Sequence, residues 1–340
     1  MNAPTAESLL QLAEVLRPRF RGAEARAALG ELEARYGEVP AAIEWFGGEG
    51  RVDEARRLAT ALVPFWMATR RMDDGLHQLE RVLALAGGDD GHRGRALFNS
   101  GYLAFWKGEY GPSSEFYSEA VAVGRRANNP TLTALALVGL ARIALLSDVE
   151  EARRLCRQAI AEAEATNDEA GRSSAMHVLG VAAQMAGDLL EARDVMSRRI
   201  ALARHTGDLS TVSSECGNLC MVERQLGNLD GAEALAKEAL EIDVRSGNGM
   251  AIPWKVNGLA AVAADRQEFD RAAALVGIAD FAMEAAGGAW PPDELAQYER
   301  TVAILTEALG ALQLDRARAA ARAMTTAEAV AFALRVRTSG

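Results

Sequence analysis

The chain has few cysteines, few aromatic residues and no long apolar run. Its 340 residues include three cysteines, and aromatic residues make up 6% of the total. Three cysteines do not build the disulfide framework that holds small secreted domains together. No apolar run approaches the roughly twenty residues of a spanning helix, which argues against a membrane protein. The first residues, MNAPTAESLL, lack the basic start and apolar core of a signal peptide, so we expect a cytoplasmic protein.

Positive charge is also scarce. The chain has only three lysines, and its formal net charge is -10. The average field of such a protein repels nucleic acids and anionic membranes, so we expect neither as a direct partner. Hydrophobic residues make up 49% of the chain and charged residues 25%, which is typical of a globular protein with ample material for a core.

The sequence repeats itself with a period of about forty residues. The segment AGDLLEARDVMSRRI at 186–200 reappears in modified form as LGNLDGAEALAKEAL at 226–240. A polar residue followed by an apolar one marks a turn in each copy, with spacings of 38, 39, 40, 40 and 40 residues between the pairs Arg71-Met72, Glu109-Tyr110, Asp148-Val149, Asp188-Leu189, Asn228-Leu229 and Glu268-Phe269. Such regularity indicates a repeat protein.

Each copy is predicted to be a pair of helices. A small residue follows each turn by four positions, where a neighbouring helix must approach closely: Gly75, Ser113, Ala152, Ala192, Ala232 and Ala272. Between copies, residues suited to ending one helix in the left-handed conformation are followed by residues suited to capping the next, in the pairs Asn128-Asn129, Asn167-Asp168, Gly207-Asp208 and Gly247-Asn248. Neither helix of a pair can bury its apolar stripe alone, so the copies must stack on one another.

The predicted fold is therefore all-α, a right-handed α-solenoid of about six helix pairs over 50–286. Packing helices over 1–49 precede it, and capping helices over 287–340, near 294–309, 312–323 and 327–336, close it. Two residues depart from the pattern. Pro64 falls inside a first helix and is expected to kink or break it, and Asp280 interrupts the apolar stripe in the sixth copy.

One copy carries a family resemblance. MHVLGVAAQMAGDLLEARDVMSRRI resembles the tetratricopeptide repeat (TPR), with Leu179-Gly180 at the helix crossing and Ala192 at the small site. Met196 takes the large apolar place usually held by an aromatic residue, and Tyr117 fills that place in the second copy. The period exceeds the common thirty-four residues, so the copies resemble the longer-helix variants.

The flanking segments extend this resemblance. LRPRFRGAEARAALGELEARYGEVPAAIEW (16–45), FWMATRRMDDGLHQLERVLAL and AAALVGIADFAMEAAGGAWPPDELAQYERTVAILTEALG are similar to the C-terminal helical region of bacterial signal-transduction ATPases with numerous domains. That family includes antibiotic-regulatory and LuxR-type transcriptional activators. The resemblance implies a sensor and protein-binding arm. The chain has no G-x-x-x-x-G-K-[ST] phosphate loop, so we expect an excised sensor domain or a stand-alone relative without ATPase activity.

The first helix of each pair is expected to line a concave groove. Its predicted lining is Arg95, Phe98, Tyr102, Phe105, Trp106, His177, Gln184, Met185, Met221, Arg224, Gln225, Trp254 and Asn257. Four aromatic residues crowd into the stretch FNSGYLAFW. This cluster is either filling for an alanine-rich core or an exposed wall for a ligand or apolar peptide. We expect Arg224 to bind a carboxylate or phosphate through its planar guanidinium.

Other candidate sites are weaker. Cys216 and Cys220 share a helix face, but the absence of further paired ligands favours buried core thiols over a metal site. His177 is expected to be a polar part of the groove lining, and exposed arginines such as Arg193 are expected to contribute little to stability. No catalytic set can be assembled from the repeat positions, so we predict no enzyme activity, no metal and no cofactor.

The leading functional hypothesis is a recognition module that binds a partner protein, a peptide or a small-molecule effector in the groove. In this reading it is the sensor part or a stand-alone relative of a bacterial transcriptional regulator. The alternative is a stand-alone repeat protein that sequesters or acts on a hydrophobic metabolite in a biosynthetic cluster.

Overall fold

The computed structural model describes residues 1–20, 24–285, 290 and 292–335. Within these ranges the chain forms eighteen α-helices and three short 3-10 helices, Arg17–Phe20, Tyr36–Glu38 and Gly249–Ala251, and no strand. The all-α prediction is confirmed. None of the described helices has the length and apolar character needed to cross a membrane.

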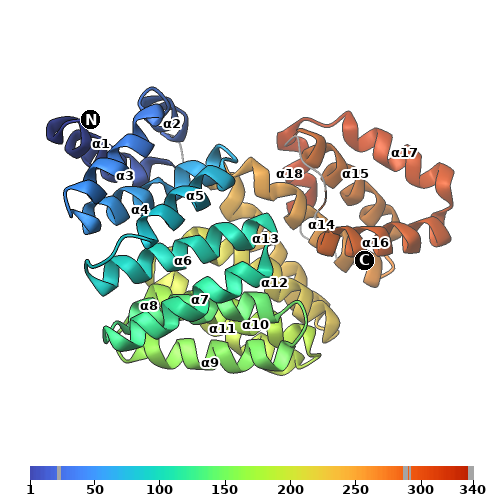
Figure 1. Ribbon diagram of the computed structural model, residues 1–340. Helices are drawn as coiled ribbons and strands as arrows, with labels where there is room; N and C mark the ends of the chain where they lie inside the picture. Colours follow the sequence, from blue (N-terminus) through green and yellow to red (C-terminus); the bar gives the residue numbers. More distant parts are fainter. Residues whose placement is uncertain (21–23, 286–289, 291, 336–340) are drawn as a thin grey trace. The chain divides into compact units, whose positions relative to one another are not determined.

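The twelve helices of the six predicted pairs are present (Figure 1). They are α4 Val52–Ala68 with α5 Met72–Leu83, α6 Asp90–Lys107 with α7 Tyr110–Arg126, α8 Pro130–Ala144 with α9 Val149–Glu164, α10 Glu169–Met185 with α11 Leu189–Thr206, α12 Leu209–Gln225 with α13 Leu229–Ser246, and α14 Ile252–Asp265 with α15 Phe269–Ala285. Every second helix begins at the apolar residue of its aligned turn pair. The flanking helices are α1 Ala3–Leu16, α2 Ala25–Glu33 and α3 Val39–Gly48, and then α16 Pro292–Leu309, α17 Ala311–Arg322 and α18 Thr326–Leu334.

Local capping explains most of these boundaries. The side chains of Asn129, Asp168 and Asp208 accept hydrogen bonds from the backbone N–H three residues further on, at 3.0, 2.9 and 3.0 Å. The preceding residues take positive φ angles, from 48° at Asn128 to 74° at Gly207, as the left-handed helix end requires. Asn248 was expected to cap in the same way, but its amide instead donates to the Asp243 carboxylate at 3.1 Å.

Pro64 was predicted to kink or break its helix, and the structure shows that it does not break it. Helix α4 continues through it to Ala68. The proline has no N–H, so it cannot donate to the carbonyl of Thr60 one turn earlier. The apolar residues of the helix, including the buried Leu58, Leu62, Phe65 and Trp66, hold it in the core despite that missing bond.

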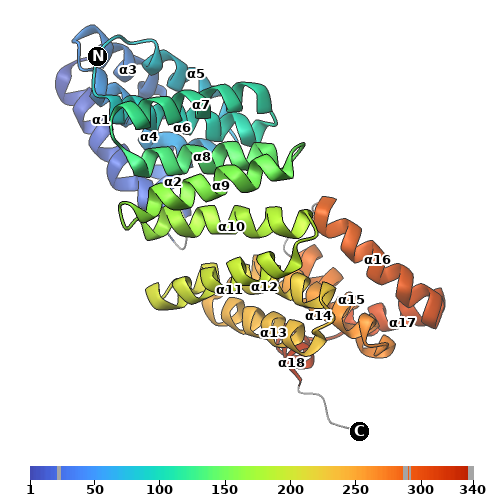
Figure 2. The ribbon, with the colours of Figure 1, turned by 90° about the horizontal axis from the view of Figure 1, so that it is seen from below.

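The chain divides into two compact units, Met1–Ala182 and Ala183–Gly340, which we describe separately. Within the first unit α6, α7, α8 and α9 pack in succession, and within the second α12, α13, α14 and α15 do (Figure 2). The domain boundaries inferred from the sequence, which separate a superhelix over 50–286 from capping helices on either side, stay a prediction.

Glycine and tyrosine set the spacing of the helices in the first unit. The Tyr117 ring, 3% exposed, packs against both Gly101 on α6 and Gly139 on α8. A Cβ atom at Gly101 would lie 2.8 Å from this ring, and one at Gly139 only 2.5 Å, well inside van der Waals contact. The large residue expected in the second repeat thus needs two glycines opposite it.

One expectation about side chains is settled by burial. Cys216 and Cys220 are buried free thiols, in agreement with their interpretation as core residues, and burial raises the pKa of Cys216 to about 12. Arg193 has a partner that the sequence analysis did not identify, and its expected small contribution to stability stays a prediction. Its guanidinium forms a two-pronged ion pair with the buried Glu223 carboxylate, at 2.7 and 3.1 Å.

Candidate ligand-binding site

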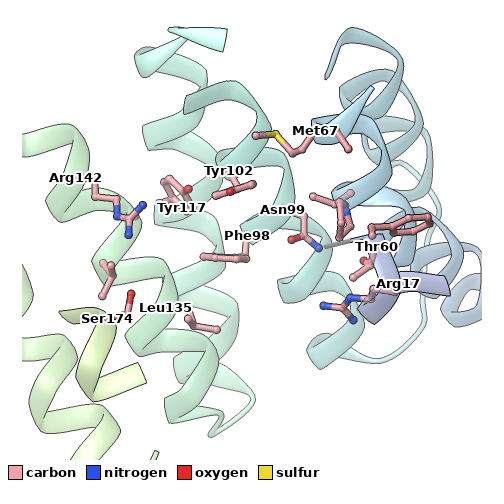
Figure 3. Close-up of a pocket in the computed structure, with 16 residues that line it drawn as sticks. Arg17, Thr60, Met67, Phe98, Asn99, Tyr102, Tyr117, Leu135, Arg142 and Ser174 are labelled. Atoms are coloured by element: carbon pink, nitrogen blue, oxygen red, sulfur yellow. The ribbon is translucent and has the colours of Figure 1, made fainter. Parts of the chain in front are cut away.

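A cavity of about 690 Å³ lies within the first unit (Figure 3). The first helices of three consecutive pairs, α4, α6 and α8, supply most of its walls. The lining is Arg17, Phe20, Thr60, Val63, Pro64, Met67, Ala68, Phe98, Asn99, Tyr102, Tyr117, Leu135, Val138, Gly139, Arg142 and Ser174. This volume is in the usual range for small-molecule sites.

Aromatic rings form one wall of the cavity. Phe98 and Tyr102 are one turn apart on α6 and are both half-buried. The ring centroid of Phe98 lies 5.7 Å from that of Tyr117 on α7, in a tilted arrangement. Burial raises the pKa of Tyr117 well above its ordinary value, so its phenol stays neutral. The wall therefore offers flat apolar surface edged by neutral hydroxyl groups.

Asn99 is the most distinctive polar group of the lining. Its side chain is 7% exposed, and Nδ2 is buried without a hydrogen-bond partner among the described residues. In Figure 3 its amide lies between Phe98 and Thr60. A buried amide donor without a partner costs roughly 1–3 kcal/mol. The cavity therefore holds a donor that a ligand carbonyl or carboxylate could satisfy.

The charged groups of the cavity are all positive. The exposed Arg17 and the half-buried Arg142 line it, and no aspartate or glutamate does so in the part of the chain that the structure describes. Neither arginine forms an ion pair or side-chain hydrogen bond within the described part of the chain. Figure 3 shows Arg17 at the α4 side of the cavity and Arg142 at the α8 side. This is an unusual environment in a chain whose net charge is -10.

The structure brings together part of the predicted aromatic cluster. Phe98 and Tyr102 line the cavity, and Arg95 stacks on Phe98 with its guanidinium carbon 6.0 Å from the ring centroid. Phe105 and Trp106 do not line it. Trp106 is 51% exposed and meets Tyr102 edge-on at 6.2 Å. His177 is half-buried on α10 outside the lining, although Ser174 on the same helix contributes to it.

The predicted groove residues of the second unit have mixed positions. Met221 and Trp254 line a separate cavity of about 370 Å³ together with Asn218, Lys255 and others. Asn257 is fully buried and so belongs to the core. Gln184 is half-buried, and Met185 and Gln225 are exposed, all three outside this cavity.

Arg224 does not offer the free guanidinium that we expected. Its Nε lies 2.6 Å from Oδ2 of Asp265, so it already holds a carboxylate of the chain itself. Its side chain is largely buried in that ion pair and lines neither of the two cavities described above.

Sequence reasoning missed Arg17, Thr60, Asn99 and Arg142. Asn99 follows Phe98 directly on a helix that was predicted to line the groove. The helical period could therefore have placed Asn99 near the binding surface. Arg17 belongs to a 3-10 turn outside the repeats, and no repeat position predicts where its side chain lies.

Comparisons with known proteins support the repeat fold. No model of a known protein family matches the chain, and no curated protein matches it in sequence. Among solved structures, the apo form of RapI is similar with a TM-score of 0.64 and 11% identity over 92% of this chain and 85% of that one. A Rap protein complexed with Competence and Sporulation Factor has a TM-score of 0.60 and 13% identity over 94% and 89%. The apo quorum sensor NprR from B. thuringiensis has a TM-score of 0.55 and 11% identity over 92% and 84%.

At such low identity the likeness concerns the fold. The chain has the TPR-like helical-repeat fold that these structures share. The TPR part of the sequence resemblance is thus confirmed, and the finer link to signal-transduction ATPases stays a prediction.

Proposed function

We propose that the chain is a non-enzymatic recognition module that binds an effector, a short peptide or a small organic molecule, in the cavity of the first unit. The observation that carries the proposal is Asn99, a nearly buried lining residue beside an aromatic wall whose Nδ2 has no hydrogen-bond partner among the described residues. Polar groups of this kind fix the orientation of a ligand that apolar surface holds.

The chemistry of the lining favours binding over catalysis. Among the described residues, the lining includes no histidine, carboxylate, cysteine or lysine, so none of them provides a general base beside the hydroxyls of Thr60 and Ser174. Arginine cannot take a proton at physiological pH. The two arginines also argue against a wholly apolar metabolite as the occupant.

Two similar structures agree with a binding role. One Rap protein is described in complex with Competence and Sporulation Factor, and NprR is described as a quorum sensor. We infer that this chain likewise reports the presence of an effector, as the sensor part or a stand-alone relative of a bacterial transcriptional regulator.

Native mass spectrometry of the protein, incubated with a small-molecule and peptide extract of its source cells, tests the proposal. We expect a retained ligand on the unmodified chain and its loss from Asn99→Leu, which keeps the side-chain size but removes the amide. Arg198→Ala changes an exposed residue of α11 in the second unit and serves as the control. Equal retention by Asn99→Leu, or no adduct on the unmodified chain, would contradict the proposal.

A further inference from the structure

We propose that the ligand of this cavity is an elongated organic dianion, with one negatively charged group at each end and an apolar body between them. This inference rests on the proposed function and specifies its ligand class. It follows from the positions of Arg17 and Arg142, the absence of acidic residues from the lining, and the apolar surface between the two arginines.

The Arg142 end is prepared for an anion. Arg142 projects from α8 beside the neutral Tyr117, and no carboxylate lines the cavity near it. Other arginines of the chain form ion pairs, as Arg193 does with Glu223 and Arg224 does with Asp265. Arg142 is half-buried and, like Arg95 and Arg172, has no ion pair or side-chain hydrogen bond among the described residues.

The Arg17 end contains a second unpaired arginine nearby. Burial lowers the pKa of Arg95, and the charge of Arg17 lowers it further, so the two guanidinium groups are close enough to repel. Arg95 forms no ion pair among the described residues, although the charge of Asp168 acts in the opposite direction and raises its pKa. A carboxylate or phosphate between Arg17 and the cavity floor would offset this repulsion, and it would also lie near the unpaired amide of Asn99.

The surface between the two ends is apolar. In Figure 3, Phe98 and Leu135 lie between Arg17 and Arg142, and Val63, Met67 and Val138 also line the cavity. A compact ion such as inorganic phosphate would reach one arginine and leave this surface without contacts. A ligand with an apolar body between two charged groups reaches both arginines and covers the aromatic wall.

Isothermal titration calorimetry of the full chain with defined probes tests this inference. The probes are octanedioate, decanedioate and dodecanedioate, with the monocarboxylate and the diol of matching length for each. We expect at least one dicarboxylate to bind about tenfold or more tighter than its monocarboxylate, the scale of one additional charge-assisted hydrogen bond. We also expect its affinity to fall as salt is added, while the diols bind weakly or not at all.

Single substitutions test whether each arginine binds one charged end of the ligand. Arg17→Gln or Arg142→Gln should each reduce dicarboxylate affinity to that of the monocarboxylate, and Arg142→Lys should restore part of it if the positive charge is what matters. Arg198→Gln is the matched control on an exposed arginine. Circular dichroism spectra confirm that each variant is folded.

An acetylated aspartyl-leucyl-leucine peptide carries the same two charges on an amide body. Its tighter binding would identify a peptide effector, and tighter binding of a dicarboxylate would identify a small molecule. Both results support the dianion.

The inference fails if no dianionic probe binds, if the diols bind as well as the dicarboxylates, or if both arginine substitutions leave affinity unchanged. This failure is distinct from failure of the proposed function. A ligand retained from cell extract that is lost in Asn99→Leu but kept in both arginine variants would preserve the recognition role and overturn the dianion.

Discussion

The phenol of Tyr298 donates a 2.6 Å hydrogen bond to the carboxylate of Asp280 and thereby joins helix α16 to helix α15. Arg318 of α17 completes the group, because its Nη2 donates to the same phenol at 2.7 Å and its Nε lies 3.2 Å from Asp280 Oδ2. Asp280 is the residue that interrupts the apolar stripe of the sixth repeat. The interruption marks where capping helices, with polar partners, pack in place of a seventh repeat.

Tyr298→Phe tests this connection. The substitution keeps the ring and removes the donor, leaving Asp280 with Arg318 alone. We expect a loss of about 1–3 kcal/mol in the free energy of unfolding, the usual effect of leaving a partly buried acceptor without its donor. Urea denaturation measures it. Tyr110→Phe, on an exposed tyrosine, is the control and should change stability little. Equal behaviour of the two variants would show that the cap does not depend on this bond.

Glu233 gives the second unit a defined acid sensitivity. Burial alone would raise the pKa of its carboxyl, but hydrogen bonds from Lys237, Arg266 and Arg271 outweigh burial and lower the pKa to about 2. Lys237 Nζ and Arg271 Nη2 both lie 2.9 Å from Oε1. Because the folded pKa is below the unfolded value of 4.5, the stabilisation is complete above pH 4.5 and is lost as the pH falls towards 2.

We therefore expect Glu233→Gln to make the free energy of unfolding depend less on pH between 4.5 and 2. Each pKa unit corresponds to about 1.4 kcal/mol, so the stabilisation lost on acidification is at most about 3 kcal/mol. Thermal melts from neutral pH down to the acid transition, compared between the two proteins, measure the difference. Glu238→Gln, on a more exposed carboxylate paired with Arg204, is the matched control. A profile for Glu233→Gln that runs parallel to the unmodified one would contradict the assignment.

Ala192 tests the close approach of helices in the repeats. It is fully buried in the core cluster with Met196 and Val212. Ala192→Leu should overpack this site and cost roughly 1–3 kcal/mol, as added methylene groups do in a close-packed interior. Ala232→Leu, at the equivalent place one repeat later, should behave alike. Thermal or urea melts measure both, with Arg198→Ala as the neutral control. A stable Ala192→Leu would mean that the small sites are not packing constraints.

The comparison of sequence with structure shows which features a repeat predicts. Helix boundaries followed from the spacing of turn pairs and caps, because these depend on local backbone chemistry. The ion pairs between helices could not be predicted from these local signals. Arg193 has the spacing of an exposed residue, yet its partner Glu223 lies thirty residues away on another helix. Such pairing depends on how neighbouring repeats stack, which the helical period alone does not specify.

Some residues of the candidate site could be predicted from the sequence for the same physical reason, and others could not. The i, i+4 spacing of Phe98 and Tyr102 placed both on one face of α6, and both line the cavity. Trp106 continues that series, but it lies at the end of the helix, where no neighbouring helix encloses it. Arg17 and Arg142 come from elements whose relation to α6 is tertiary, so no local pattern could have joined them.

This difference along α6 gives the last prediction. Tyr102→Ala removes a wall of the cavity, and we expect it to weaken ligand binding by about 2 kcal/mol or more, the scale of a central aromatic anchor. Trp106→Ala removes a ring that touches Tyr102 but lies outside the cavity, so the loss should be much smaller. Calorimetric titration with the best-binding dicarboxylate compares the two variants. Circular dichroism should confirm that both variants are folded, because Tyr102 also packs against the core of the first unit. Equal losses would show that the ligand extends beyond the cavity along the exposed end of α6. Unchanged affinity in Tyr102→Ala would move the binding site away from this wall altogether.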